Sequence, residues 1–523
     1  MRTLEKAKTF IMKISPVQKA TFWSTVIWGI ITHLAVFSAG LMYHDGLYYS
    51  GLGSTYTSGR WLLGVINDVG SNCLGIYQLP YLNGFITIFF LALSAMLITS
   101  VLKVRTKFSG VLIGAILVSF PSVASLFSYM FTAPVYSLSL LTSIIAVYLV
   151  NDKQTLVRIA VGACFMCMSL GIYQAYLAFA APLALIVVIC DGLREQDADV
   201  KALFKKGIIF IITLLFGLIL YLLINNAFVT IKDISLTSYQ GINKMGQASF
   251  EEIITAVRFS YSQCFSCKWL GIISSVFMQR LSQIVEILAV LLFVYALFRS
   301  KSTLKKCIFL SVLFLLVPLA INSIYLTQAH SIVKVHSLMR YALVFTYIFP
   351  VILIDIVPWD VNIRKVENAF CTASLAIIVL VPLCYTYRDN TAYLSASTTQ
   401  QQTVLYLNSL VTRIRCTDGY SDELPVAYIG KSINDDTIDR LPSYDRIYTF
   451  NLYQSVTEIL IPAMKQDRLK TYLSLHLAFS PQVISGTGEI EETDEFKTMP
   501  CYPDSGSIKI IDGVIVVKFS EPD

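Results

Sequence analysis

The stretch GIIFIITLLFGLILYLLINNAF, residues 207–228, carries no charged side chain from end to end. A helix of about 20 such residues crosses the hydrocarbon core of a bilayer. Comparable apolar stretches recur along the first three quarters of the chain, and they predict eleven membrane spans. The predicted ranges are 20–42, 80–102, 108–127, 134–150, 157–173, 175–190, 207–228, 284–298, 307–326, 341–357 and 367–387. The sequence therefore predicts a mainly α, polytopic membrane protein.

The composition is typical of a membrane protein. Of 523 residues, 55% are hydrophobic and 14% are charged, whereas soluble domains carry about 25% charged residues. Basic residues gather at the N-terminus and in every second connection, near residues 103–107, 153–158, 194–206, 299–306 and 364–365. Because loops rich in Lys and Arg stay in the cytoplasm, we expect a cytoplasmic N-terminus and an extracytoplasmic C-terminus. These loops also account for the net charge of +6, which therefore indicates no nucleic-acid partner.

The chain divides into a membrane body at residues 1–387 and an extracytoplasmic domain at residues 388–523. Two longer outer loops are expected within the body, at 43–79 and 229–283. In the second loop, Ser249 is followed three residues later by Glu252, which predicts a capping box at the start of a helix. We expect this amphipathic helix to lie at the membrane interface.

The C-terminal 136 residues have the patterns of a small α/β domain. A Ser/Thr/Gln-rich segment at 395–403 precedes a predicted helix at 404–414, and a second helix is expected over 459–475. Residues 425–430 predict a strand. Residues 507–519 predict two strands joined at Asp512-Gly513, a dipeptide typical of tight hairpins. No phosphate-binding glycine loop or nucleotide-binding fingerprint is present in the chain.

The first candidate site lies just after the first span, where Tyr43-His44-Asp45-Gly46 is followed by Gly59-Arg60-Trp61. A solvated loop carboxylate or a helix cap is the simpler interpretation of Asp45. An interfacial belt would explain the aromatic residues, but it does not explain an acid and an arginine together. A second acid of this loop, Asp68, lies in a sequence typical of a turn.

The second candidate site is the loop before the tenth span, which carries His330, Lys334, His336 and Arg340 on the predicted outer face. Ordinary interfacial Lys and Arg side chains would explain it. The functional interpretation is a site for an anionic headgroup, because Arg binds phosphate through two parallel hydrogen bonds and Lys acts as a point charge.

The third candidate is the turn Gly171-Ile172-Tyr173-Gln174-Ala175-Tyr176 between the fifth and sixth spans. Tyr173 and Gln174 are suited to line a sugar-sized pocket. The alternative is that they only form hydrogen bonds within a buried helix turn.

The cysteines leave two disulfides open, Cys264 with Cys267 and Cys416 with Cys501, because sequence spacing does not establish pairing. No His/Cys cluster has the spacing of a zinc site. We therefore expect no cofactor; a divalent metal is compatible with the chemistry, but the sequence shows no ligand set for it.

Taken in their order along the chain, these motifs resemble the GtrII-like glucosyltransferases, membrane enzymes of the GT-C type associated with glucosylation of O-antigen. The resemblance rests on Asp45 after the first span, Ser58-Gly59-Arg60-Trp61, Gly171-Ile172-Tyr173-Gln174-Ala175, the basic loop that ends in Arg340, and the C-terminal stretch from Met499 to Ile508. It implies a bacterial inner-membrane enzyme that takes glucose or a related hexose from a polyprenyl-phosphate donor. The acceptor would be a glycan or lipid-linked glycan outside the membrane.

The resemblance also implies roles for the candidate residues. Asp45 would act as general base in an inverting displacement, although GT-C enzymes often carry paired acids there and Asp45 is followed by Gly46. The donor phosphate would be bound by Arg60, Lys334, His336 and Arg340, and the sugar or acceptor by His44, Trp61, Tyr173 and Gln174. The alternative function is a transporter or flippase for a lipid-linked sugar, which would place charges at mid-membrane depth on several helices.

Overall fold

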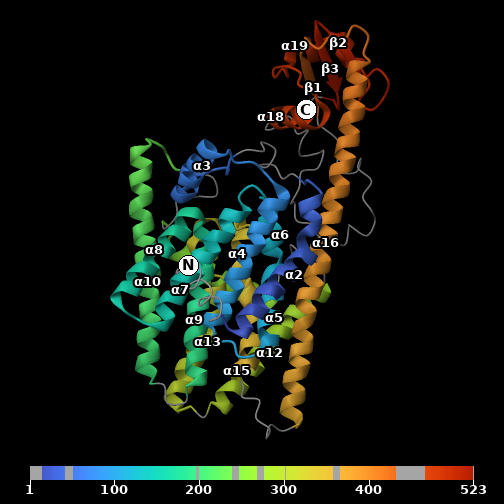
Figure 1. Ribbon diagram of the computed structural model, residues 1–523. Coiled ribbons are helices and arrows are strands. Elements are labelled where there is room, and N and C mark those ends of the chain that lie inside the picture. The colour runs from blue at the N-terminus through green and yellow to red at the C-terminus, as the bar shows by residue number, and fades with distance from the viewer. Residues whose placement is uncertain are drawn as a thin grey trace, which may run out of the picture. The chain divides into compact units, whose positions relative to one another are not determined.

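The computed structural model describes residues 14–41, 51–195, 199–237, 247–267, 276–300, 302–356, 365–430 and 466–521. These residues form two compact units (Figure 1). The first contains residues 14–38 and 51–391, and the second contains residues 39–41 and 392–521. Asp45 and His44 lie outside the described residues.

The first unit is a bundle of helices. Its α-helices are α2 (Pro16–Ser38), α3 (Trp61–Cys73), α4 (Pro80–Val101), α5 (Lys107–Ser119), α6 (Pro121–Phe127), α7 (Ala133–Asp152), α8 (Leu156–Ile172), α9 (Leu177–Arg194), α10 (Val200–Ile231), α11 (Phe250–Ser266), α12 (Val276–Arg299), α13 (Leu304–Ile321), α14 (Ile324–Thr327), α15 (Phe345–Ile356) and the first part of α16 (Lys365–Arg415). Its 3₁₀ helices are η2 (Tyr56–Ser58), η3 (Gln174–Tyr176), η6 (Ala329–Lys334) and η7 (Ser337–Val344).

The predicted membrane spans correspond to these helices. In the part of the chain that is described, nine helices are long and apolar enough to cross a bilayer, or ten with the bent pair α5 and α6. The remaining predicted span is α8, whose 17 residues extend about 26 Å at 1.5 Å per residue. The prediction of a polytopic helical membrane protein is therefore confirmed.

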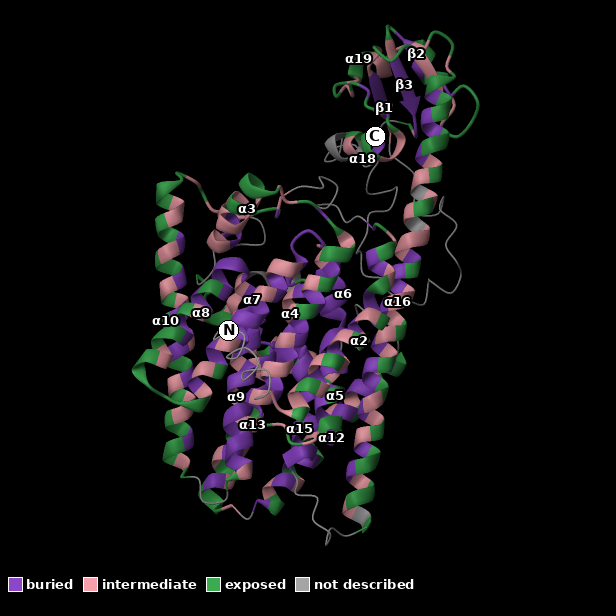
Figure 2. Cartoon of the chain, viewed as in Figure 1, coloured by how far each residue is buried: buried purple, intermediate pink, exposed green. Residues whose placement is uncertain are grey.

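The bundle packs through small residues, as membrane helices commonly do. A Cβ atom at Gly110 of α5 would lie 2.5 Å from Thr21 Oγ1 of α2, and one at Gly114 would lie 2.6 Å from Thr25 Oγ1. Figure 2 shows α9 as almost wholly buried, whereas α10 turns an exposed face outward. That face includes Leu215, a large apolar residue with no protein partner to cover it, as expected of a surface in contact with lipid.

Proline explains the bend between α5 and α6. The two helices meet at an angle of 47° at Phe120 and Pro121. Proline removes a backbone donor and forces the preceding residue out of the helical region, and Phe120 accordingly adopts φ −68° and ψ 137°. The hydroxyl groups of Ser122 and Ser125 on α6 form hydrogen bonds with Ser337, and so hold η7 against the bend.

Three sequence predictions about local structure can be compared with these elements. The capping box is confirmed, since Ser249 and Glu252 each bond the backbone N–H of the other. The turn predicted at Asp68 is wrong, because this residue lies within α3. The helices predicted at 367–387 and 404–414 are one continuous helix, α16. Its hydroxyl side chains bond carbonyls one turn earlier, as Thr398 does to Leu394 at 3.0 Å, so the polar segment remains helical.

The second unit contains a three-stranded sheet of order β1-β3-β2, with β1 (Val426–Ile429), β2 (Ile508–Ile511) and β3 (Val514–Lys518). Strand β1 pairs in parallel with β3, and β2 pairs antiparallel with it. Asp512 and Gly513 take φ angles of 48° and 77° in the predicted hairpin turn. The helices of this unit are the second part of α16, α18 (Gln466–Leu477), α19 (Gly488–Glu491) and α20 (Asp494–Lys497). The predicted strand and hairpin are thus confirmed, and α18 covers the described part of the helix expected at 459–475.

The core of the second unit lies between α16 and the sheet. Leu410 and Ile414 of the helix are buried against Val426 of β1 and against Ile515 and Val517 of β3. This apolar layer is what makes the C-terminal residues a unit with a core of its own.

Candidate functional site

Arg60 lies beside a stacked pair of tyrosine rings at the start of α3. Its Nη1 donates a hydrogen bond to the hydroxyl of Tyr136 at 2.9 Å and a longer one to the Ser54 carbonyl at 3.3 Å. The guanidinium carbon lies 5.7 Å from the centre of the Tyr136 ring and 5.4 Å from that of Tyr173. These two rings stack on one another with their centres 4.4 Å apart. Arg60 is thereby fixed by two hydrogen bonds and by contacts with two aromatic rings.

The chain that leads into Arg60 is held by two membrane helices. The Nε2 of Gln174, in η3, donates to the Ser58 carbonyl at 2.8 Å and to the Tyr221 hydroxyl at 3.1 Å. Tyr221, in α10, donates in turn to the Gly59 carbonyl at 2.9 Å. Gly59 has a φ of 69°, and a Cβ atom there would lie 2.9 Å from the Tyr221 hydroxyl. Only glycine fits this turn without strain.

Trp61 packs on the other side of the same turn. A Cβ atom at Gly171 would lie 2.6 Å from the indole, so the ring rests directly on the backbone at the end of α8. The indole stacks on Phe228 of α10, with ring centres 5.7 Å apart, and Phe228 stacks on Tyr56 at the same distance. The motifs at 58–61 and 171–176 therefore form one packed structure.

Asp68 joins α3 to α10 at the edge of this structure. The Tyr56 hydroxyl donates to Asp68 Oδ2 at 2.7 Å, and Lys232 Nζ lies 3.3 Å from the same oxygen. The hydrogen bond from Tyr56, assisted by Lys232, lowers the pKa of Asp68 below its usual value. Asp68 is therefore a partnered carboxylate that positions α3.

Arg340 lies in a second polar cluster, on η7. Its Nη2 donates to the Val335 carbonyl at 2.7 Å, and its guanidinium carbon lies 5.8 Å from the centre of the Tyr325 ring. Both nitrogens of His330 are buried without a hydrogen-bond partner among the described residues, as are the Tyr325 hydroxyl, Ser323 Oγ and the Nε atoms of Arg340 and Arg60. Buried polar atoms without partners are uncommon and call for a specific explanation.

The turn at η3 connects the two clusters. It bonds the Arg60 turn through Gln174, and it packs against η7, the element that carries Arg340. Tyr341 fixes η7 from the other side by donating to the Leu117 carbonyl at 2.8 Å. The structure thus brings Arg60, Trp61, Tyr173 and Gln174 together and places η7 beside them. His336 is exposed and immediately precedes η7. Lys334 is the last residue of η6, and its side chain is outside the described residues.

Several residues of this structure escaped sequence reasoning. Tyr136 and Tyr221 are tyrosines within apolar spans, and Tyr325 and Ser323 lie at the beginning of α14. A hydroxyl-bearing side chain inside an apolar stretch is the signal that would have identified the first two, because such a group requires a partner inside the membrane.

Among the described residues, no group of three His, Cys, Asp or Glu side chains is arranged to hold a metal ion. The two pairs named above, Cys264 with Cys267 and Cys416 with Cys501, consist of free thiols. Burial raises the pKa of Cys264 and of Cys267, and Cys264 Sγ lies 3.6 Å from Glu286 Oε1.

Comparison with known proteins assigns the family. The model of the GtrII glucosyl transferase family matches residues 34–347, which is more than half of the chain. The chain belongs to the GtrII glucosyl transferase family. The matched region includes the Arg60 turn, the turn at η3 and the Arg340 cluster, and it ends before α16 and the sheet. No curated protein and no solved structure matches the chain. Membership of this family, together with the apolar helices, supports a membrane glycosyltransferase.

Proposed function

We propose that this GtrII glucosyltransferase takes glucose or a related hexose from a polyprenyl-phosphate donor. The acceptor in this proposal is an extracytoplasmic glycan, such as O-antigen or another cell-surface polysaccharide, or its lipid-linked form. The observation that supports a phosphate-bearing donor is Arg60. This cation is held beside two stacked tyrosine rings, and its Nε is buried and unpartnered among the described residues. The sequence also lacks any nucleotide-binding fingerprint, which favours a lipid-linked donor over a nucleotide sugar.

The reaction would be a single inverting displacement of the GT-C type. Asp45 takes the proton of the acceptor hydroxyl, and the oxygen attacks the anomeric carbon. The bond from that carbon to the phosphate oxygen breaks, and polyprenyl phosphate leaves with the electron pair. Arg60 and Arg340, with Lys334 and His336, would stabilise the charge that develops on the leaving phosphate. The role of Asp45 rests on the sequence alone.

The sugar and acceptor would be bound by His44, Trp61, Tyr173 and Gln174. Trp61 has one face stacked on Phe228, and the buried Tyr173 has one face stacked on Tyr136, so in this proposal only their opposite faces would pack on a sugar ring. The Nε2 of Gln174 is already engaged by Ser58 and Tyr221, so in this proposal Gln174 acts chiefly by holding the Arg60 turn. No cofactor is required by this chemistry.

The proposed location is the bacterial inner membrane, with a cytoplasmic N-terminus and the domain at 388–523 outside. Lys103, Arg158, Arg194 and Lys206 support this orientation, because they gather at the ends of α4, α8, α9 and α10 that lie away from η3. Loops with such a charge excess stay in the cytoplasm. The Arg60 turn would then face the outside.

The second candidate function is a transporter or flippase for a lipid-linked sugar. Glu286 favours it, because this acid lies in the middle of α12, beside Cys264. The family favours an enzyme. The ion pairs of Lys103 with Asp191 and of Lys232 with Asp68 also favour it, because they involve helix ends, whereas a transporter would place charges at mid-membrane depth.

The decisive experiment is transfer of radiolabelled sugar from polyprenyl-phosphate glucose in proteoliposomes. We expect Asp45→Asn to lower the rate by about 10²- to 10⁴-fold, the usual contribution of a positioned base. Asp152→Asn, which alters an exposed ion pair with Arg158, is the matched control and should retain the wild-type rate. Full activity of Asp45→Asn would remove Asp45 as the base. Lipid translocation without transfer by the wild type would establish the flippase instead.

A further inference from the structure

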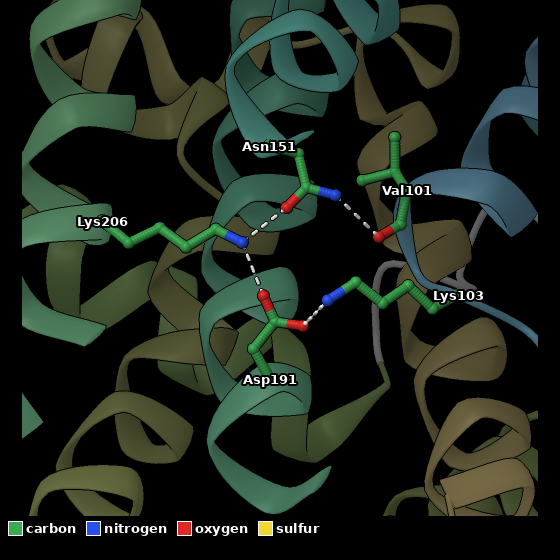
Figure 3. A network of polar contacts seen from close by, with 5 residues as sticks. All are labelled: Val101, Lys103, Asn151, Asp191 and Lys206. Carbon is green, nitrogen blue, oxygen red and sulfur yellow. Dashed lines mark hydrogen bonds and ion pairs between the residues drawn. The ribbon is translucent and has the colours of Figure 1, made fainter. Parts of the chain in front are cut away.

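A network of charged and polar side chains lies where α4, α7 and α9 end and α10 begins (Figure 3). Asp191 of α9 accepts from Lys103 Nζ at 2.8 Å and from Lys206 Nζ at 2.5 Å, one lysine on each carboxylate oxygen. Lys206 also donates to Asn151 Oδ1 at 2.6 Å, and Asn151 Nδ2 donates to the Val101 carbonyl at 3.1 Å. Asp191 is therefore paired with two cations.

The other acid at this end is also occupied. Asp355, at the end of α15, accepts hydrogen bonds from the backbone N–H of Arg105 at 2.7 Å and of Thr106 at 3.0 Å, and from the Thr106 hydroxyl at 2.9 Å. The buried Lys306 of α13 donates to the carbonyl of Glu195, the residue after α9. Both carboxylates are thus engaged by other groups, and neither accepts a hydrogen bond from Arg194.

Arg194 is the cation that remains. It lies three residues after Asp191, at the end of α9. Its Nε, Nη1 and Nη2 atoms are all buried, and none has a hydrogen-bond partner among the described residues. A buried guanidinium without an acceptor is strongly unfavourable.

The balance of charges around Arg194 indicates that the ligand of this site is an anion. Among the groups of this network, the cations Lys103, Arg194, Lys206 and Lys306 outnumber the carboxylates Asp191 and Asp355, so the network carries an excess of positive charge. Lys103 is half exposed, so the cluster reaches the molecular surface. Helix ends of a membrane protein lie at the level of lipid headgroups. A compact anion with several oxygens fits a guanidinium through two parallel hydrogen bonds.

We propose that Arg194 is the centre of a phosphate-binding site at the end of α9. The ligand is either the phosphate headgroup of an anionic lipid or a free phosphate ion. Between Leu177 and Asp191 the helix rises about 21 Å, so this site is distinct from the Arg60 turn. The site does not depend on the proposed reaction. It would stabilise the junction of α4, α9, α10 and α13.

The test uses the full-length protein purified in non-ionic detergent. Bound lipid is counted by native mass spectrometry, and the melting temperature is measured with phosphatidylglycerol, with phosphatidylcholine and with inorganic phosphate. We expect phosphatidylglycerol to bind and to raise the melting temperature, and Arg194→Ala to weaken that binding about tenfold or more, as expected for a lost charge-assisted contact. Arg194→Lys should restore part of the binding. Arg158→Ala, which removes an exposed arginine paired with Asp152, is the matched control.

Each outcome decides the proposal. Binding of phosphatidylglycerol but not of inorganic phosphate, lost in Arg194→Ala, establishes a lipid headgroup. Equal stabilisation by inorganic phosphate, lost in the same variant, establishes free phosphate. The proposal is overturned if Arg194→Ala binds both anions as the wild type does, or if neither anion binds the wild type. Since the unliganded wild type buries an unpaired charge, Arg194→Ala should be no less stable than the wild type in phosphatidylcholine.

Discussion

Arg60 and Tyr136 are joined by a hydrogen bond of 2.9 Å between Nη1 and the phenol oxygen, although they are 76 residues apart in the chain. The bond ties the turn before α3 to the first part of α7 and leaves Arg60 Nε free of any partner in the described structure. The arginine is thus held in one orientation before a substrate arrives, which reduces the cost of ordering it on binding.

Replacing Arg60 should therefore affect catalysis more than folding. We expect Arg60→Ala to lower sugar transfer by about 10- to 100-fold through loss of a charge-assisted contact. Arg60→Lys should recover only part of the rate, because it keeps the charge but loses the planar fork. Transfer assays in proteoliposomes measure both, with Arg158→Ala as the control. A wild-type rate in Arg60→Ala would exclude Arg60 from the donor site.

The contact of Gly171 with Trp61 predicts a steric effect. Gly171→Ala places a Cβ atom 2.6 Å from the indole, so Trp61 must move or the helix end must shift. We expect a loss of about 1–3 kcal/mol in unfolding free energy, the usual cost of overpacking. The matched control is Gly207→Ala, where nothing lies within 4 Å. Melting temperatures that fall equally in the two variants, or in neither, would contradict the packing described.

Tyr221→Phe removes one hydroxyl from the support of the Arg60 turn. The hydroxyl donates to the Gly59 carbonyl and accepts from Gln174, so its loss should cost about 1 kcal/mol and loosen the turn. We expect a lower transfer rate together with a lower melting temperature. Tyr148→Phe, at an exposed tyrosine of α7, should leave both unchanged. An unaltered rate in Tyr221→Phe would show that the turn is held without this bond.

The second unit contains a pH-sensitive group, His476 of α18. Burial lowers the pKa of His476 below its usual value, and its Nε2 has no partner in the described part of this unit. The unfolded chain then binds a proton at a higher pH than the folded unit does. The free energy of unfolding of the second unit should therefore be greatest above the ordinary histidine pKa of about 6.5, and it should decline as the pH falls below that value.

Hydrogen exchange of β1 and β3 at pH 7.5 and at pH 5.5 measures this effect. We expect protection to fall at the lower pH in the wild type. The fall should be smaller in His476→Phe, which cannot be protonated. Equal pH dependence in the two proteins would assign the effect to another group.

Sequence patterns predicted the helices of the first unit because each membrane helix must satisfy its own backbone hydrogen bonds, so its apolar length is visible locally. The Ser249 capping box and the Asp512-Gly513 hairpin are equally local. The turn expected at Asp68 was wrong because the pairing of this acid with Tyr56 and Lys232 comes from packing, not from its neighbours in sequence.

The site was predictable only in part for the same reason. Arg60, Trp61, Tyr173 and Gln174 were identified as residue types suited to a site, and the structure packs their two motifs together. Their partners Tyr136 and Tyr221 belong to helices distant in sequence. No spacing rule connects a tyrosine in a span to an arginine in a loop, so those contacts required the fold.

The short length of α8 has a consequence for the membrane itself. Its 17 residues, about 26 Å, are fewer than the hydrocarbon core of about 30 Å requires, whereas its neighbour α10 has 32. A bilayer meeting this mismatch thins locally, or the turn at Gly171 and Tyr173 lies below the surface that the longer helices reach. A locally thinned bilayer would bring the headgroup phosphates to the level of the aromatic turn and Arg60, as the proposed lipid-linked donor requires. A substrate on a lipid carrier would reach them by lateral diffusion, without leaving the membrane.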